Sequence, residues 1–458
     1  MRQMTLVAFL QAQNCTNLAS SWRHPDSRTD TWSPNYYRDI GRVLEAGKFH
    51  LGFFDDRLSM PDMYGRNHAH TVRHGIRCVK LDAVTVLMVM GMATERLGLG
   101  ATYSTSYYEP FHVARLFATV DLRTAGRAAW NVVTSLNDGE AQNMGHQQVI
   151  DHDLRYDRAD EFMEVVLGHW DTWEDDAIVQ DKATGLFADP VKVHRLDHKG
   201  RFLRSRGPFT VPRSAQGHPV IIQAGQSGRG KAFGARWGEL IFVIYPDLAA
   251  GKHDTADFKA AVAGYGRDPA HIIITQLVTP VAAATKMEAE DRWSVISQLP
   301  LEIDALSLLS EALNFDFTTK GMDEAFTDEE MAGISGLRTL RDQVVTASGN
   351  NNPTVRDFIH FSGRGRVHNP IIGGPKEICD QLEQWFIERA CDGFVIAATH
   401  VPGAYEDFVR FVVPELQRRG LFHQDYAGKT VRANLGLPVA KRAAWRSNSL
   451  LNSAANRK

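Results

Sequence analysis

Short runs of apolar and β-branched residues alternate along the chain with longer stretches in which apolar residues recur every three or four positions. Runs of the first kind predict buried strands, and stretches of the second kind predict amphipathic helices. Eight strands are expected: Thr5–Ala12, His50–Asp56, Leu97–Ser104, Ala128–Ser135, Pro219–Gly225, Leu240–Tyr245, Ile272–Val281 and Asp392–His400.

Helical patterns separate these strands. They cover Tyr36–Lys48, Asp82–Thr94, His112–Leu122, Asp157–Trp173, Gly228–Trp237 and Asp257–Gly264, followed by a helix opened by Pro375 and another over Tyr405–Arg418. Regular alternation of strand and helix predicts a parallel sheet, and eight units favour closure into a (β/α)₈ TIM barrel. We therefore expect one barrel domain over residues 1–458, with an open doubly wound sheet as the alternative.

The alternation is interrupted between the seventh and eighth strands, over residues 285–368. This segment is helix-rich, and because it follows a strand it is expected on the catalytic face of the barrel as a lid. A surface insertion without that role is the alternative. Residues 427–458 carry seven Lys or Arg residues and no acid. They predict a C-terminal arm that is frayed or packs on a neighbouring subunit.

Composition changes this picture little. The chain has 458 residues, 43% of them hydrophobic and 23% charged, and a net charge of -3, which is ordinary for a soluble globular protein. Nothing in this balance calls for a nucleic-acid or membrane partner. The four cysteines are scattered without a C-x-x-C pair, as expected of reduced thiols. The apolar run Thr5–Leu10 is too short for a signal peptide, so a cytoplasmic protein is expected.

The chemistry of a parallel barrel lies where its strands end. Those ends read FFDDR, GATYSTS, WNVVTS, QAGQSGRG and AATH. Small residues, hydroxyls and few acids suit a flat ligand better than a metal, which needs several His and carboxylate ligands. The H-x-H pair of His68 and His70 lies in a polar loop well past the second strand. It is therefore interpreted as solvated or substrate-facing, and no metal site is predicted.

The stretch QAGQSGRGKAF has the G-x-x-x-x-G-K frame of a phosphate-binding loop. Ala232 stands where that motif needs a hydroxyl for Mg²⁺, so phosphoryl transfer is not expected. Backbone N–H groups at the start of the following helix, with the Ser227 hydroxyl, predict a site for a static phosphate. Arg229 and Lys231 add positive charge. A glycine-rich turn that binds nothing is the alternative.

The helix that follows the fourth strand opens with HDLRYDRADEF. Its His152 and Tyr156 are candidates for hydrogen bonds to a ligand, with helix capping as the alternative. No G-x-S-x-G elbow and no G-x-G-x-x-G after a strand are found. A glycosidase stays open, because sequence cannot pair two carboxylates across a substrate.

Five stretches together resemble one family: WRHPDSRTDTWSPNYYRDIGRVLEAGKFHLGFFDDRL, LGLGATYSTSYYEPFHVARLFATVD, GRAAWNVVTSLNDGEAQNMG, HPVIIQAGQSGRGKAFGAR and TVRANLGLP. It is the flavin-dependent monooxygenases typified by nitrilotriacetate and dibenzothiophene-sulfone monooxygenases, a branch of the bacterial-luciferase-like barrels. The resemblance implies reduced FMN across the strand ends, in contact with Asp56, Thr102, Asn131, His152, Tyr156 and Ser227. By that pattern Ser227 holds the phosphate. It assigns no catalytic residue.

Two stretches depart from the family. Asp55-Asp56-Arg57 stands where relatives often have Pro-Asp, so the carboxylate is kept while Arg57 alters the pocket mouth. HAHTVRHGIR is not a motif of the family, and we expect it to contribute to substrate choice.

The resemblance implies the oxygenase component of a two-component monooxygenase. A separate NAD(P)H:flavin reductase would supply FMNH₂, and O₂ would react through a flavin hydroperoxide to oxygenate a small organic substrate. Phe9, Trp22, Tyr107 and Tyr108 near the strands favour an aromatic one. The alternatives are an F420-dependent oxidoreductase on the same barrel, a TIM-barrel hydrolase and a ligand-binding protein without catalysis. A homodimer or homotetramer is expected.

Overall fold

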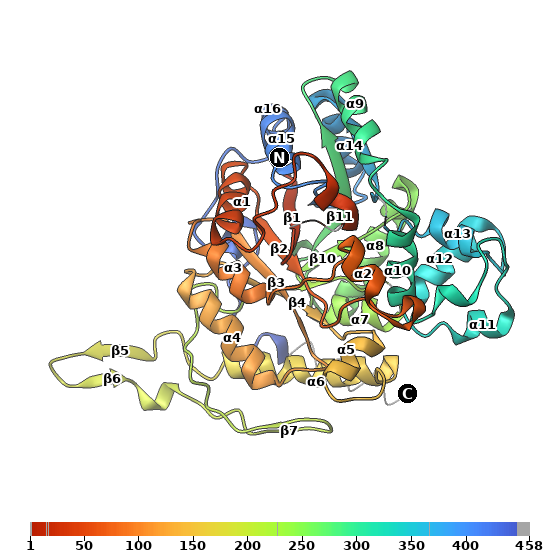
Figure 1. The fold of residues 1–458 in the computed structure, drawn as a ribbon. Helices are drawn as coiled ribbons and strands as arrows, with labels where there is room; N and C mark the ends of the chain where they lie inside the picture. The colour runs from red at the N-terminus through yellow and green to blue at the C-terminus, as the bar shows by residue number, and fades with distance from the viewer. Residues whose placement is uncertain (1, 15, 17, 227, 366, 447–458) are drawn as a thin grey trace.

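Eight parallel strands form a closed barrel in the computed structural model (Figure 1). The structure describes residues 2–446 apart from residues 15, 17, 227 and 366, and it does not describe the side chains of residues 338 and 339. The strands are β1 (Thr5–Gln11), β2 (Leu51–Asp55), β3 (Gly98–Ser104), β4 (Ala128–Val133), β9 (Val220–Gln223), β10 (Leu240–Val243), β11 (Ile273–Ala282) and β13 (Gly393–Ala397). They pair in chain order, and β13 closes on β1. The predicted barrel and all eight predicted strands are confirmed.

Successive residues of each strand face opposite sides of the barrel wall. Phe53 packs inside, with its ring centroid 4.6 Å from that of Phe242. Its neighbour Phe54 packs outside, in the core between strands and helices. The apolar run of each strand therefore fills two cores at once, which is why these strands read as continuous apolar segments.

The outer layer consists of helices that follow the strands. They are α1 (Pro34–Ala46), α3 (Ala83–Gly91), α4 (Pro110–Arg123), α6 (His152–Trp170), α7 (Gly228–Trp237), α8 (Leu248–Gly264), α14 (Pro375–Ile387), α15 (Gly403–Asp407), the π-helical turn η6 (Phe408–Val412) and α16 (Val413–Arg418). Helix α8 begins well before its predicted start, because the Asp247 side chain caps it by accepting from Ala250 N. None of the described helices is long and apolar enough to cross a membrane.

Shorter elements occupy the loops. The HAHTVRH stretch forms α2 (Ala69–His74) rather than the predicted loop. The others near the barrel mouth are η1 (Ala19–Arg23), η2 (Tyr64–Arg66) and α5 (Asp138–Asn143). A 3₁₀ turn, η4 (Pro269–His271), precedes β11.

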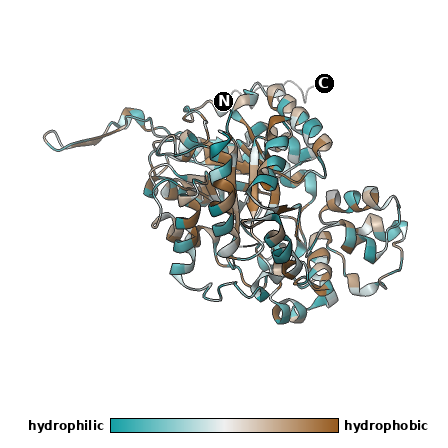
Figure 2. Ribbon diagram, turned by 90° about the horizontal axis from the view of Figure 1, so that it is seen from above, coloured by the Kyte–Doolittle hydropathy of each residue, from teal (hydrophilic) through white to brown (hydrophobic). Residues whose placement is uncertain are grey.

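The interruption before β13 is helical, as expected. It contains α9 (Lys286–Ile296), α10 (Glu302–Leu313), η5 (Phe317–Thr319), α11 (Asp328–Gly333), α12 (Arg338–Ser348) and α13 (Val355–Phe361), followed by β12 (Pro370–Gly373), which extends the end of β11. The segment has a hydrophobic core of its own around Phe317, Phe326 and Phe358. Helices α11 to α13 form a lobe beside the barrel (Figures 1 and 2).

A second interruption lies between α6 and β9, and the sequence analysis did not predict it. Two hairpins, β5 (Ile178–Asp181) with β6 (Leu186–Ala188) and β7 (His198–Lys199) with β8 (Arg204–Ser205), project from the barrel with the turn η3 (Pro190–Lys192) between them (Figure 1). These strands are two to four residues long and mostly exposed. They leave no apolar run to detect, and the prediction of a single interruption was wrong.

The C-terminal tail returns to its own barrel. Helix α17 (Val431–Asn434) covers the end at which the strands begin, and Val431, Leu435 and Leu437 join the inner core. Val431 lies against Gly98, where a Cβ would be 2.6 Å from its Cγ2. For residues 427–446 this corrects the expectation of a frayed end or an arm on a neighbouring subunit. Residues 447–458 lie outside the described part of the chain.

Candidate flavin site at the barrel mouth

Thr102 and Asn131 lie side by side where β3 and β4 end. They are partners in the strand register and are almost fully buried. Thr102 Oγ1 donates to the Phe54 carbonyl at 3.0 Å, and Asn131 Nδ2 donates to Thr102 Oγ1 at 2.8 Å. Asn131 Oδ1 is buried and accepts no hydrogen bond from any described residue. Since buried polar atoms are normally paired, this carbonyl is available to a donor on a bound ligand.

Asp56 follows β2 directly and differs from its neighbour Asp55. Asp55 accepts from Lys80 Nζ at 3.1 Å and from Gln11 Nε2 at 3.0 Å. Among the described residues, Asp56 accepts only the backbone N–H of Arg57, at 2.8 Å. Burial raises the pKa of Asp56 to about 7, against the opposing charge of Lys80. This carboxyl can therefore hold or release a proton near neutral pH.

The glycine-rich loop after β9 folds onto the hydroxyl of Tyr156. A Cβ on Gly230 would lie 2.9 Å from Tyr156 Oη, and one on Gly225 would lie 2.6 Å from the Gly230 carbonyl carbon. Only glycine permits this close approach, which brings Tyr156 to the N-terminus of α7. Ser227, the predicted phosphate ligand, lies outside the described residues.

His152 begins α6 at the outer edge of this group. Its ring centroid is 5.1 Å from that of Tyr156, and its Nδ1 is 2.8 Å from Asp153 Oδ1. Half of the side chain is exposed. The structure therefore brings His152 and Tyr156 together beside the glycine loop, with Tyr156 in the buried position.

Arg229 and Lys231 do not provide the free positive charge that the sequence analysis gave them. Arg229 Nη2 donates to Asp157 Oδ1 at 2.6 Å, and Lys231 Nζ donates to Asp257. Both cations are compensated by carboxylates of neighbouring helices. An anion at this loop would be held chiefly by the backbone N–H groups of α7 and by Tyr156.

Several polar groups of the mouth gave no signal in the sequence. Asn137 Nδ2 donates to the Glu311 carbonyl of α10 at 2.7 Å, so the insertion contacts the loop after β4. Glu140 accepts the backbone N–H of Leu58 at 3.2 Å. The Tyr107 hydroxyl is buried without a partner among the described residues, and burial raises its pKa to about 12. These contacts join segments far apart in the chain, so no local motif marks them.

At the end of β13, His400 stacks face to face on His24. The ring centroids are 3.8 Å apart and the planes differ by 8°. Burial lowers the pKa of His400 to about 3, and it also lowers that of His24. Asp26 brings a carboxylate within 4.8 Å of both rings. The sequence analysis placed His400 at a strand end, but nothing in the sequence linked it to His24.

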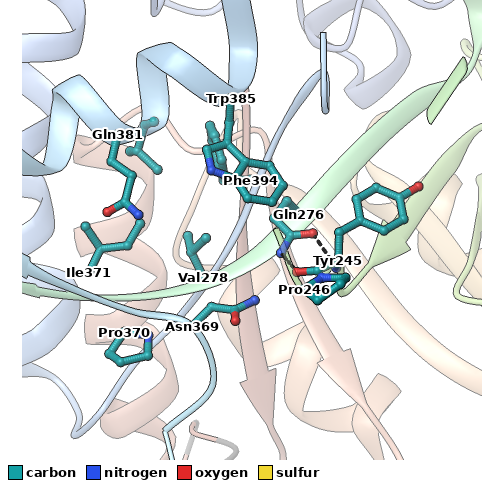
Figure 3. A pocket seen from close by; sticks show the side chains of 11 residues that line it. Tyr245, Pro246, Gln276, Val278, Asn369, Pro370, Ile371, Gln381, Trp385 and Phe394 are labelled. Carbon is teal, nitrogen blue, oxygen red and sulfur yellow. Dashed lines mark hydrogen bonds between the residues drawn. The ribbon is translucent and has the colours of Figure 1, made fainter. Parts of the chain in front are cut away.

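A cavity of about 230 Å³ lies elsewhere, outside the barrel wall and under α14 (Figure 3). Trp385 and Leu382 of α14 cover it, and Phe394 and Val278 face it from the strands. The Gln276 amide in its wall is satisfied by the Tyr245 backbone at 2.9 and 3.1 Å. None of the predicted site residues lines it, so it is separate from the mouth.

The fold and the mouth agree with comparisons to known proteins. The family model described as "Luciferase-like monooxygenase" matches residues 17–390. The chain belongs to the luciferase-like monooxygenases. It is 42% identical over 448 residues to dibenzothiophene-sulfone monooxygenase of Rhodococcus erythropolis, which covers 96% of this chain and 97% of that protein. It is 38% identical over 426 residues to nitrilotriacetate monooxygenase component A of Aminobacter aminovorans, over 92% and 94% of the two chains.

A solved relative shares the whole architecture. The crystal structure of riboflavin lyase RcaE with modified FMN and riboflavin superposes with a TM-score of 0.87 at 28% identity, over 98% of this chain and 99% of that one. The predicted family is thus confirmed, and this luciferase-like chain is a flavin-dependent monooxygenase. The hydrolase and ligand-binding alternatives are set aside.

Proposed function

We propose that this luciferase-like monooxygenase is the oxygenase component of a two-component system that uses FMNH₂ and O₂. The overall reaction converts substrate, O₂ and FMNH₂ into oxygenated substrate, FMN and water. Reduced FMN, when bound, supplies the electrons that activate O₂. A separate NAD(P)H:flavin reductase delivers it, since no dinucleotide fingerprint follows a strand in this chain. A homodimer or homotetramer in the cytoplasm remains a prediction.

The unpartnered, buried Asn131 Oδ1 is the observation that carries the proposal. An isoalloxazine ring is flat and has an N–H donor on its pyrimidine side, which suits a carbonyl at the end of β4. Thr102 fixes the orientation of this carbonyl by accepting from Asn131 Nδ2. The site residues therefore fit a flavin by their chemistry.

The flavin phosphate is assigned to the glycine-rich loop after β9, at the other end of this set of site residues. A Cβ on Gly228, the first residue of α7, would meet nothing within 4 Å, so there is room at the start of this helix, where backbone N–H groups and the helix dipole favour an anion. The Tyr156 hydroxyl supplies a further donor, and His152 a partly exposed one. Ser227 completes this set in the prediction from sequence.

Asp56 and the insertion would serve the reaction in different ways. With its pKa raised to about 7, Asp56 can donate or accept a proton beside the ring. Helix α10 contacts the loops after β2 and β4, so it would exclude water from the reacting groups. Movement of residues 285–368 as a lid remains part of the proposal.

The test combines the purified chain with FMN, NADH and an unrelated flavin reductase. We expect an oxygenated product that forms only when the chain and all three additions are present, because free FMNH₂ takes up O₂ even without the chain. We expect no oxidation of NADH by the chain alone. Rapid NADH oxidation without reductase would overturn the two-component proposal. Oxidation of reduced F420 without O₂ uptake would favour the F420-dependent alternative.

A further inference from the structure

Helix α10 forms one wall of the mouth and is met by segments from three parts of the chain. Near its start, a Cβ on Gly365 would lie 2.6 Å from the Ala305 nitrogen. One turn on, Ile76 packs with Leu308. At its end, the Glu311 carbonyl accepts from the loop after β4. These contacts follow one side of the helix, because positions three or four apart share a face.

Two of these segments carry an arginine beside the contact, and a third arginine reaches the remaining segment. Arg364 precedes Gly365, and Arg77 follows Ile76. Arg57, from the loop after β2, donates from Nη1 to the Asn137 side chain, whose Nδ2 in turn donates to Glu311. The charges of Arg57 and Arg77 both act on Arg364, so three arginines from distant parts of the sequence gather beside α10.

The positive charges of this cluster are unequally compensated. Burial tends to lower the pKa of Arg57, but Glu311 and Glu140 outweigh it and leave that pKa raised. For Arg364 the balance has the opposite sign. Burial first, and then the like charges of Arg77 and Arg57, lower its pKa to about 10 against the opposing charge of Glu311.

Arg364 is also left without partners. It forms no ion pair with any described residue, and its Nε is buried without a hydrogen bond from the described part of the chain. The nearby His368 brings no negative charge, because burial and the two cations Arg364 and Arg77 lower its pKa to about 4. The Arg364 side chain is half-buried, and its guanidinium keeps donors that no described residue accepts. Beside the Glu311 carboxylate, this cluster of three guanidinium groups can therefore accommodate a further anion.

We propose that Arg364, with Arg77 beside it, binds an anionic group of the substrate, a carboxylate or sulfonate, at the barrel mouth beside α10. Guanidinium groups present parallel N–H donors that match two oxygens of such an anion. The inference rests on the proposed function, because it takes the anion to belong to the oxygenated molecule. It replaces the expectation of a purely apolar aromatic substrate with that of an organic anion.

The test measures binding, separately from turnover, on protein saturated with FMN. Calorimetric titrations use succinate and benzenesulfonate as probes, and succinamide and benzenesulfonamide as uncharged analogues of similar shape. We expect wild type to bind at least one anion about tenfold or more tighter than its amide. Arg364→Met should abolish this preference, and Arg364→Lys should keep part of it. Arg356→Met is the matched control, since Arg356 is an exposed arginine of the same insertion paired with Asp323, and it should change nothing.

The outcomes separate this proposal from the flavin assignment. Equal binding of anions and amides by wild type, or an unchanged preference in Arg364→Met, would overturn the anion site. In protein without flavin, displacement of the anion by FMN would also overturn it and would assign the cluster to the flavin phosphate. An anion preference that is lost in Arg364→Met in a chain that binds neither FMN nor FMNH₂ would support the pocket and refute the proposed function. If Arg364→Met does not fold, the decision rests on Arg364→Lys, whose preference for the anions over the amides should be weaker than that of wild type.

Discussion

The two ends of the barrel bury charged and polar groups in opposite ways. Where the strands begin, Arg432 donates from Nη1 and Nη2 to both oxygens of Glu239 at 2.7 and 2.8 Å, and from Nε to the His218 carbonyl at 3.0 Å. Where the strands end, Asn131 Oδ1 and Arg364 Nε have no partner among the described residues. The Arg432–Glu239 network uses its hydrogen bonds internally, whereas Asn131 and Arg364 at the mouth keep unused ones.

This difference separates stability from function within one fold. A saturated buried network makes the chain rigid and leaves nothing for a ligand. An unsatisfied group is tolerated only where a ligand can complete it, which in a parallel barrel is the end at which the strands finish. Removing a charged group should therefore destabilise the protein at the first end and stabilise it at the second.

The largest effect is expected at the saturated end. Arg432→Met leaves Glu239 buried without its bidentate partner, so unfolding free energy should fall by about 3–5 kcal/mol. The urea midpoint measures the loss. Glu239→Gln in the same chain should recover much of it, since the unpaired charge is gone. The matched control is Arg418→Met. Arg418 pairs with Glu415 but is 70% exposed, so this substitution should lower the free energy of unfolding by less than about 1 kcal/mol. A loss for Arg432→Met no larger than this control would contradict the comparison.

The opposite sign is expected at the mouth. The folded pKa of Asp56, about 7, lies above its value of 3.8 in model compounds, so the folded state binds its proton more tightly than the unfolded state. Wild type should lose stability through this group as pH rises from about 4 to 7. Asp56→Asn removes the buried charge and should stabilise the protein by about 2–4 kcal/mol at pH 8, at about 1.4 kcal/mol per pKa unit.

Urea midpoints of wild type and Asp56→Asn, measured at pH 8, 6 and 4.5, test this prediction. The gain from Asp56→Asn should shrink steadily as pH falls and nearly vanish near pH 4. Asp55→Asn is the control, because Asp55 is paired with Lys80 at 3.1 Å and its loss should not stabilise. An Asp56→Asn variant that is less stable than wild type at pH 8 would show that the carboxylate is compensated.

The same contrast explains what could be predicted from sequence. The strands and most helices depend on local apolar patterns, as in Ala128–Val133 and Gly228–Trp237, and were found almost at their observed bounds. The helix over His152–Trp170 was predicted only from Asp157. Thr102 and Asn131 were expected close together because strand ends in a parallel barrel share one edge, while their contact with a flavin was implied by the family resemblance and stays a prediction. The projecting hairpins were missed, since Ile178–Asp181 and its partner bury almost nothing.

The charged cluster on α10 could not be predicted for a different reason. Arg57, Arg77 and Arg364 are separated by long stretches of chain, and each looks like an ordinary surface arginine in its own segment. Their proximity exists only because the insertion lies across the mouth. A single sequence carries the local periodicity of a helix such as α10, but it does not say which loops that helix will contact.

A smaller effect, on binding rather than stability, is expected at the glycine loop. Tyr156→Phe removes a hydroxyl that meets the N-terminus of α7, and a hydrogen bond to a charged group contributes about 1.5–3 kcal/mol. FMNH₂ affinity should fall roughly tenfold or more in an anaerobic titration, with little change in the urea midpoint. Riboflavin, which has no phosphate, should bind both proteins equally. Equal FMNH₂ affinity in the two proteins would remove Tyr156 from the phosphate site.

The smallest effect tests the unused carbonyl itself. Asn131→Leu keeps a side chain of similar size and removes Oδ1, which no described residue uses. Thr102 Oγ1 still donates to the Phe54 carbonyl, so stability should change by less than about 1 kcal/mol and could rise, because a buried unpaired atom is gone. A bound flavin loses one neutral hydrogen bond of about 0.5–1.5 kcal/mol, which is roughly a 2- to 13-fold loss of affinity. Binding of FMNH₂ and of riboflavin should weaken equally, because the ring that both share makes this hydrogen bond. A clear loss of stability with unchanged flavin affinity would mean that Asn131 serves the fold, and that the two ends of the barrel do not differ as described.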